Sequence, residues 1–195
     1  MGADMLLMKC MMESDAFELT NQLLNSIFEV INKNIDKMNF IFDDIDVSAN
    51  ANYAIRYAAE NGYADIVKLL LKDKRVDPAA GYNYAIRYAA ANDHYDVVKL
   101  LLKDKRVDPS ANDNEAIRSA VSNKCYKVVK LLLKDKRVDP SVHYNEIIKK
   151  LLRRGSSKDI KLIELVFSDE RVKLLLPPEY RDDIEKLLDE YDPLK

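Results

Sequence analysis

The sequence predicts an all-α solenoid: a stack of short helix-turn-helix units that are joined by short loops or hairpins and closed by capping helices. Two observations carry this prediction. The stretch KLLLKDKRVDP occurs three times without a change, at 68–78, 99–109 and 130–140, with a period of 31 residues. A second block, Asn-X-Ala-Ile-Arg, begins at Asn52, Asn83 and Asn114 and keeps the same period. A fixed period of roughly 20–50 residues is typical of repeat architectures.

The first half of each unit predicts a short helix with a face of small apolar residues. In the unit 52–82 these residues recur at helical spacing: Ala54, Ile55, Ala58 and Ala59. Asn52 precedes them, and we expect it to cap the helix because its side-chain oxygen can accept an unpaired backbone N–H. The pair Asn61-Gly62 suits a tight turn, so the helix should end there.

The second half of each unit predicts a second helix that starts near Asp65 and is followed by a closing loop. Its apolar positions are Ile66, Val67, Leu69, Leu70 and Leu71. Pro78 cannot continue a helix, so residues 77–83 should form a crossing loop or a hairpin. Neither short helix can bury its apolar face alone. Stacked copies can, and each buried leucine then contributes about 1.5–3 kcal/mol.

The block AIRYAAENGYADIVKLLL resembles the ankyrin repeat, whose usual pattern is TPLHxAAxxGHxxVVxLLL. Ala58, Gly62, Val67 and the leucines at 69–71 match this pattern directly. Residues 53–56 stand where the family has TPLH, so the threonine–histidine hydrogen bonds of that motif are absent. The period is two residues shorter than the usual one of about 33. This shorter type, with RVDPS in the loop, resembles ankyrin arrays of giant DNA viruses that infect amoebae.

The period divides the chain into seven segments. A shift of 31 residues places Leu23 and Leu24 under Ala54 and Ile55, which indicates a degenerate first repeat. Arg171-Val172 aligns with Arg75-Val76 if three extra residues lie in the turn 153–158. We therefore predict an N-terminal helix or tail at 1–20, an N-capping repeat at 21–51, regular repeats at 52–82, 83–113 and 114–144, a divergent repeat at 145–176, and a C-capping helix at 177–195 that Pro177-Pro178 opens. The methionine-rich segment 1–20 either covers the first repeat or docks on a partner.

No catalytic, cofactor or metal motif is present in the sequence. The two histidines, His94 and His143, occupy different positions of their repeats, and four glycines leave little scope for a phosphate-binding loop. We expect His94 to have a structural role in its turn. Cys10 and Cys125 predict free thiols in a reducing compartment. No apolar run approaches 18 residues. We therefore expect a non-enzymatic protein without cofactors, located in the cytoplasm of a host cell.

The positions that vary between near-identical repeats predict where a partner binds. The resemblance to ankyrin repeats implies a concave recognition surface, made of the loop tips and the exposed side of the first helices. Carried onto this sequence, that surface comprises Tyr53, Glu60, Tyr82, Tyr84, Ala91, Asn112, Asp113, Glu115, Ser122, His143 and Tyr144. For Tyr57 and Tyr88, packing between repeats is an equal alternative. We expect the partner to be a protein, specifically a host protein, and the chain to be a monomer.

An alternative function is binding of nucleic acid or another anionic partner. The unit 114–144 holds seven basic residues against three acidic ones, and the next unit adds a further group: Lys149, Lys150, Arg153, Arg154 and Lys158. These bases would form a basic half of the stack. In the regular units, however, acidic residues such as Asp73 and Asp77 interleave with the bases. Aromatic platforms for single strands are also missing from the basic half. We therefore rank nucleic acid second to a protein partner.

Overall fold

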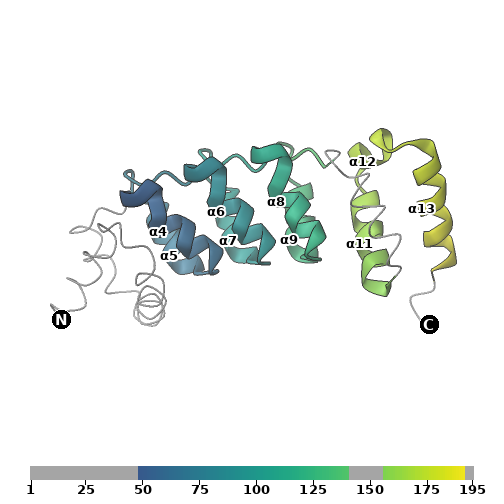
Figure 1. Cartoon of the computed structure of the whole chain (residues 1–195), viewed down its shortest axis with the longest axis horizontal. Helices are drawn as coiled ribbons and strands as arrows, with labels where there is room; N and C mark the ends of the chain where they lie inside the picture. The colour runs from purple at the N-terminus through teal and green to yellow at the C-terminus, as the bar shows by residue number, and fades with distance from the viewer. Residues whose placement is uncertain (1–47, 141–155, 192–195) are drawn as a thin grey trace.

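The chain folds as a stack of helix pairs, which confirms the all-α prediction (Figure 1). A computed structural model describes residues 48–140 and 156–191. Three pairs follow one another: α4 (Ala49–Glu60) with α5 (Ala64–Leu70), α6 (Ala80–Ala91) with α7 (Tyr95–Leu101), and α8 (Ala111–Ser122) with α9 (Tyr126–Leu133). After the gap come α11 (Ser157–Phe167), α12 (Glu170–Leu175) and α13 (Pro178–Glu190). The predicted tail 1–20 and most of the predicted repeat 21–51 lie outside the described residues.

The first helices pack on one another in one row and the second helices in another. The small apolar face of the first helices is buried as predicted, and Ala58, Ala89 and Ala120 have no exposed surface. Alanine at these positions lets neighbouring helices approach closely, because each residue contributes only a methyl group. In the second helices Leu70, Leu101 and Leu132 are fully buried, whereas Leu69 and Leu71 are half-buried.

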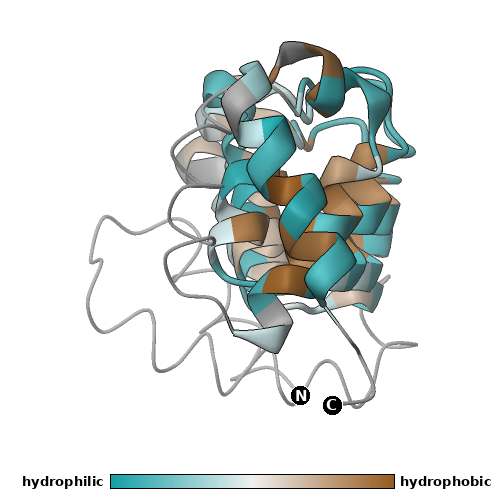
Figure 2. Cartoon of the chain, turned by 90° about the vertical axis from the view of Figure 1, so that its right-hand side faces the viewer, coloured by the Kyte–Doolittle hydropathy of each residue, from teal (hydrophilic) through white to brown (hydrophobic). Residues whose placement is uncertain are grey.

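The last helix, α13, closes the stack and faces the reader in the end-on view of Figure 2, which shows both polar and apolar residues along it. Ile184 is fully buried, and Leu187, Leu188 and Tyr191 are half-buried. The helix begins with Pro178 in its first turn, where the missing N–H of proline costs no hydrogen bond. The predicted apolar stripe therefore faces the stack, and the acidic residues Asp182, Glu185 and Asp189 are exposed.

The prediction that Asn52 caps the first helix is wrong. Asn52, Asn83 and Asn114 take left-handed backbone angles, with φ of 59°, 58° and 56°. Asparagine is one of the few residues that adopt this conformation readily. Their Oδ1 atoms accept hydrogen bonds from the backbone N–H groups of Asp77, Asp108 and Asp139, at 2.6, 2.7 and 2.8 Å. Each asparagine thus joins the start of its unit to the loop that closes the same unit, 25 residues later.

At three boundaries between described units, an arginine binds main-chain carbonyls of the unit before it, an arrangement that we call the arginine clamp. Arg106 Nη1 donates to the carbonyl of Val76 at 2.7 Å, and Nη2 donates to the carbonyl of Leu71 at 3.2 Å. The Asp104 carboxylate also binds the guanidinium, with Oδ2 2.6 Å from Nη2. Leu71 follows the last residue of α5, where backbone carbonyls lack a partner within the helix. The clamp therefore caps the C-terminus of one helix with a side chain from the next unit.

The arginine clamp recurs at two further boundaries. Arg137 donates to the carbonyls of Val107 and Leu102, at 2.7 and 3.1 Å. Arg171 donates to those of Val138 and Leu133, both at 2.7 Å. The sequence separation to the acceptors is three residues longer for Arg171 than for Arg137, 33 against 30 and 38 against 35. Arg171 nevertheless makes the same bonds, as its alignment with Arg75 predicts.

The turn between the two helices of a unit also bonds to the preceding unit. Asn92 Nδ2 donates to the carbonyl of Glu60 at 2.9 Å, and His94 Nε2 lies 2.9 Å from the same oxygen. His94 therefore has the predicted structural role. Gly62 accommodates this histidine: its φ is +77°, and a side-chain carbon added there would lie 2.6 Å from His94 Nδ1. At the next boundary the smaller Cys125 replaces the histidine, and Asp93 replaces the glycine at φ 60°.

A buried carboxylate joins the third described helix pair to α11. Asp159 is fully buried, and its Oδ1 lies 2.7 Å from Nζ of Lys124. Ser156 Oγ donates to the other carboxylate oxygen. Burial alone would raise the pKa of Asp159, but the Lys124 ammonium and the Ser156 bonds outweigh it and hold this pKa below its usual range. Lys124 stands where the first regular unit has Gly62, so the substitution has a structural purpose.

We predict that Arg106→Lys destabilises the stack, because one ammonium cannot bind two carbonyls and a carboxylate in the planar geometry of a guanidinium. The free energy of unfolding should fall by about 1–2 kcal/mol, measured by urea denaturation followed by circular dichroism. Lys105→Ala is the control, since this neighbouring side chain is exposed. Equal free energies of unfolding for the two variants would show that the arginine clamp does not contribute to stability.

We predict that Lys124→Met lowers the free energy of unfolding by about 3 kcal/mol at pH 7, because it leaves Asp159 buried without its counter-ion. In the wild type the folded-state pKa of Asp159 is depressed, so its stabilisation is present at neutral pH and is lost as pH falls through that pKa. In the variant burial should raise this pKa above the unfolded value, so protonation should favour the folded state.

The deficit of Lys124→Met relative to wild type should therefore shrink as pH falls from 7 towards 4, in urea titrations at several pH values. Lys127→Met is the control, because Lys127 is exposed and has no ion pair among the described residues. Its effect should stay within about 0.5 kcal/mol. A deficit of Lys124→Met that does not change with pH would contradict the assigned role of Asp159.

Candidate protein-binding surface

The surface starts from three tip loops, defined as Ala51–Asn52, Gly81–Asn83 and Asn112–Asn114, which precede the right-handed parts of α4, α6 and α8. Every residue of these loops has a positive φ, between 53° and 65°. The arginine of the Ala-Ile-Arg motif fixes each loop from within its own helix. Arg56 Nε donates to the carbonyl of Ala51 at 3.0 Å, and Arg118 Nη2 to that of Asn112 at 3.2 Å. These hydrogen bonds therefore fix the backbone of each tip loop in a defined conformation.

Tyr82 stands out among the tip residues. Its side chain is 84% exposed, although it is large and apolar, and its φ is 57°. Arg87 Nη1 donates to the carbonyls of Gly81 and Tyr82, at 3.2 and 3.1 Å. A left-handed conformation costs a residue other than glycine roughly 1–2 kcal/mol, and for a bulky residue it is a genuine outlier. The fold thus holds a tyrosine in solvent at a conformational cost.

The tip loops present different residues on one backbone shape. Ala51, Tyr82 and Asp113 are equivalent under the 31-residue shift, and all three are exposed. Asn112, also exposed, donates a hydrogen bond from Nδ2 to the Glu115 carboxylate. The predicted candidates Tyr82, Asn112 and Asp113 therefore lie at exposed positions of the tips. His143 and Tyr144, predicted for the next tip, lie outside the described residues.

Glu60 and Tyr84 contact each other across a repeat boundary. The Tyr84 hydroxyl donates to Glu60 Oε2 at 2.9 Å. The Tyr84 ring stacks on Tyr88, with centroids 3.9 Å apart and an interplanar angle of 10°. Burial, followed by the hydrogen bond to Glu60, raises the pKa of Tyr84 far above its usual range, so the hydroxyl remains a donor. Both residues are half-buried and hold α4 against α6.

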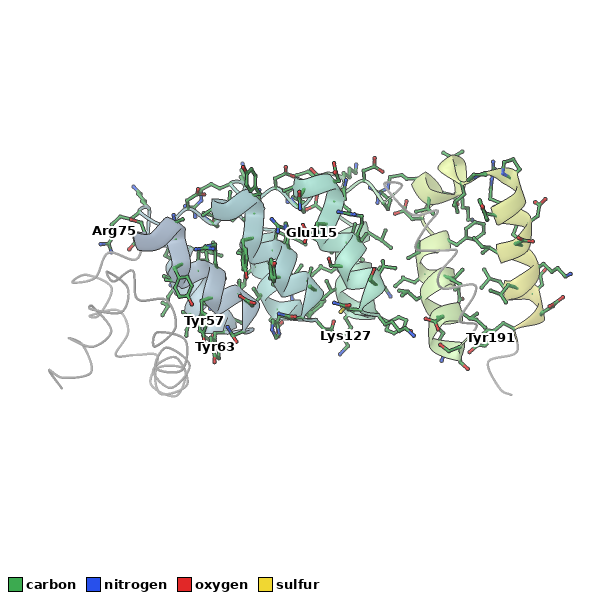
Figure 3. The ribbon with its side chains drawn as sticks, viewed as in Figure 1. Tyr57, Tyr63, Arg75, Glu115, Lys127 and Tyr191 are labelled. Atoms are coloured by element: carbon green, nitrogen blue, oxygen red, sulfur yellow. The ribbon has the colours of Figure 1, made fainter. Side chains whose placement is uncertain are left out.

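Glu115, which Figure 3 labels, makes the corresponding contact one unit later. Its Oε2 lies 2.9 Å from Nε of Arg87, and both side chains are largely buried. The equivalent arginine, Arg56, lies 5.3 Å from the centroid of the Tyr84 ring. A constant arginine on one helix therefore meets a tyrosine or a glutamate on the next. Sequence analysis missed this pairing, although variation at 84 and 115 beside constant arginines was a signal for it.

The remaining predicted residues lie along the first helices. Tyr53 is half-buried and stacks on Tyr57, with centroids 5.7 Å apart at 29°. Burial, and then the charge of Glu60, raises the pKa of Tyr53. Ala91 is half-buried, and its carbonyl accepts a hydrogen bond from Asn123 at 2.9 Å. Ser122 is exposed at the end of α8. Tyr57 is buried, so packing describes it better than recognition.

Metal ligands, the cysteine thiol and the apolar length of the helices can be assessed for the described residues. In 48–140 and 156–191, no group of three or more histidine, cysteine and carboxylate side chains could hold a metal ion. Burial raises the pKa of the Cys125 thiol to about 11, so the thiol is protonated at neutral pH and is a poor nucleophile. Among the described helices, none combines the length and the apolar character that crossing a membrane requires.

The described bases of the basic half divide into two groups. Lys124, Arg118 and Arg137 are engaged within the stack, in the ion pair with Asp159, the tip loop and the arginine clamp. Lys127, Lys130 and Lys134 are exposed and lie on the second helix α9 or at its end. The predicted bases Lys149, Lys150, Arg153 and Arg154 lie outside the described residues, as does the side chain of Lys158.

Comparison with known proteins identifies the repeat. The family model for ankyrin repeats (3 copies) matches residues 7–113 and 55–144. None of the curated proteins and none of the solved structures matches the chain. The two overlapping matches together extend from residue 7 to residue 144, well over half of the 195 residues. The helix pairs, the small-residue faces of the first helices and the family match agree, and this chain belongs to the ankyrin-repeat family.

Proposed function

We propose that this protein binds another protein through its tip loops and the exposed side of its first helices. The observation that carries the proposal is the exposed Tyr82. A residue that remains in solvent at a conformational cost does not serve the stability of the fold, so its use lies outside the chain. Tyrosine combines a large contact area with a low entropy cost of immobilisation, which suits it to be an interface anchor.

The order of the tips would define the partner. Because α4, α6 and α8 pack in a row, a partner crossing the tips meets Ala51, then Tyr82, then Asp113; the sequence continues the series with Tyr144. A small residue, an aromatic ring and a carboxylate at regular intervals allow a partner to align with the repeats in one position only. The matching partner surface offers a pocket for a tyrosine ring and a cationic group opposite Asp113.

The contacts between first helices would contribute by making the surface rigid. Tyr84 with Glu60, and Arg87 with Glu115, fix neighbouring units against each other. A surface that is ordered before binding loses less entropy when the partner arrives. We therefore assign Tyr53, Tyr82, Asn112, Asp113 and Ser122 to direct contact. Glu60, Tyr84, Ala91 and Glu115 lie at its border and hold it in shape, and His143 and Tyr144 extend it by register.

The short repeat type adds a biological setting to the proposal. Its resemblance to ankyrin arrays of amoeba-infecting giant DNA viruses supports a viral protein that acts as a monomer in the host cytoplasm on a host protein. Such a protein would act without catalysis, by occupying or recruiting its partner.

We predict that Tyr82→Asn weakens partner binding by about tenfold or more, because it removes the anchor ring. The free energy of unfolding should stay within about 1 kcal/mol of wild type, since asparagine adopts the left-handed conformation more readily than tyrosine. Partners would first be captured from a host-cell lysate on immobilised wild-type protein and identified by mass spectrometry. Each purified partner would then be titrated against wild type and variant.

The control is Leu174→Asn, which removes a side chain of 75% exposure on α12 and tests for non-specific apolar adhesion. This control should bind like wild type. Equal affinity of Tyr82→Asn and wild type for every captured partner would contradict the proposal, and so would equal losses in the two variants.

A further inference from the structure

A second surface lies on the opposite side of the units, between the second helices α7 and α9. A cavity of about 430 Å³ opens there, lined by Tyr95, Lys127, Lys130, Leu131 and Lys134. We call it the α7–α9 groove. Tyr95 begins α7 and the other four residues belong to α9 or its end. Figure 3 shows Lys127 at the end of the helix pair opposite to the loop end at which Arg75 lies.

The groove carries a row of positive charge. Lys127, Lys130 and Lys134 follow one another at spacings of three and four residues, so they lie along one face of α9. In the described part of the chain none of them forms an ion pair. Lys99 from α7 adds a fourth ammonium, 5.9 Å from the centroid of the Tyr95 ring.

The acidic groups near the row do not neutralise it. Asp104 and Asp135, which follow α7 and α9, are bound by Arg106 and Arg137 at 2.6 and 2.7 Å. α9 contains no acidic residue. The exposed Asp96 in the first turn of α7 is the acid that these two helices contribute. Four lysines against one aspartate leave the groove strongly positive.

Two substitutions distinguish this groove from the equivalent place between α5 and α7. Under the 31-residue shift, Tyr95 corresponds to Ala64, and Lys127 corresponds to Asp96. The other lining residues keep their type, with Lys99, Leu100 and Lys103 at the equivalent positions. The α7–α9 boundary therefore gains an aromatic ring and reverses one charge. On an outer face that otherwise repeats, these two changes define a single position for a ligand.

The spacing of the groove matches a helix. Successive ammoniums are separated by about 4.5 and 6 Å along α9, from the rise of 1.5 Å per residue. Carboxylates at positions i, i+3 and i+7 of a second helix have the same separations. Half-buried Leu131 and Tyr95 form an apolar floor on which an apolar residue of that helix can rest. The lining has no guanidinium to bind phosphate in a bidentate manner.

We propose that the α7–α9 groove binds an acidic amphipathic helix of a partner protein, with its carboxylates on the lysine row and an apolar side chain on Tyr95 and Leu131. This site is separate from the tip loops, so it adds a second contact to the proposed function and does not depend on it. Helices bound in grooves are a recurring mode of peptide recognition.

The test uses a fluorescein-labelled peptide of about 18 residues, long enough for helix formation, with glutamate along one stripe and leucine along the adjacent one. A peptide of the same composition in scrambled order is the ligand control. By fluorescence anisotropy at about 0.15 M salt, wild type should bind the amphipathic peptide with a Kd in the micromolar range. The scrambled peptide should bind at least about tenfold more weakly.

The matched variant is Tyr95→Ala with Lys127→Asp, which installs the residues of the preceding boundary and therefore suits the scaffold. It should lower the affinity at least about tenfold. The converse variant, Ala64→Tyr with Asp96→Lys, should create a second groove and raise the stoichiometry from one peptide to two. Tyr82→Asn should bind the peptide like wild type, so a failure of the tip loops and a failure of the groove can be told apart.

Three results would overturn the proposal. The first is equal peptide affinity in wild type and Tyr95→Ala/Lys127→Asp. The second is equal affinity for the amphipathic and the scrambled peptide, which would show attraction by charge alone. The third is tighter binding of a single-stranded or duplex oligonucleotide of about 20 nucleotides, with a steep salt dependence and loss in the same variant. That result would assign the groove to nucleic acid.

Discussion

The bond from a guanidinium of one unit to the carbonyls at a helix end of the unit before is the interaction on which the rest of this structure depends. α5 and α7 have seven residues each and α9 has eight, which is too short for a helix to persist alone in water. Their C-terminal carbonyls need donors, and the arginine clamp supplies them from the next unit. Buried alanines in the first helices allow the close approach that the clamp requires. Each short helix is therefore stable only when the next unit is stacked on it.

In this arrangement the residues that hold the stack together stay constant, and the exposed side chains vary between units. The arginine clamp, the asparagines that begin the units and the tip-fixing arginines all bind main-chain atoms. Side chains that point away from these bonds can then change without consequence for the stack. The tips use that freedom to present alanine, tyrosine and aspartate on one backbone shape. On the second-helix side, the substitutions at Tyr95 and Lys127 make one groove differ from the otherwise repeating face.

Much of the fold followed from the sequence, because period and apolar spacing report directly on burial. The positions of the helices, the turn at Gly62, the role of His94 and the opening of α13 by proline could all be predicted. The role of Asn52 could not, because its acceptor bond goes to a backbone N–H 25 residues away, whereas capping rules consider neighbours. The arginine clamp could not be predicted either, because its partners are carbonyls, which every residue possesses and no sequence pattern marks.

The candidate surface was less accessible to sequence reasoning. Variation between repeats identified exposed tips such as Tyr82 and Asp113, and it also selected Tyr84 and Glu115, which vary because they pair differently with constant arginines. Variation alone does not distinguish a residue that contacts a partner protein from one that contacts the adjacent repeat.

The use of main-chain carbonyls as acceptors has a consequence for how such a chain can change length. The carbonyl acceptors are equivalent at the three described boundaries, although the side chains of those units differ. An extra unit inserted by tandem duplication of its coding segment therefore finds its bonds already in place on both sides, without compensating substitutions elsewhere. Three copies of an unaltered eleven-residue stretch are what recent duplication leaves behind. The chain is built so that evolution can add or delete whole repeats first and adjust their exposed residues afterwards.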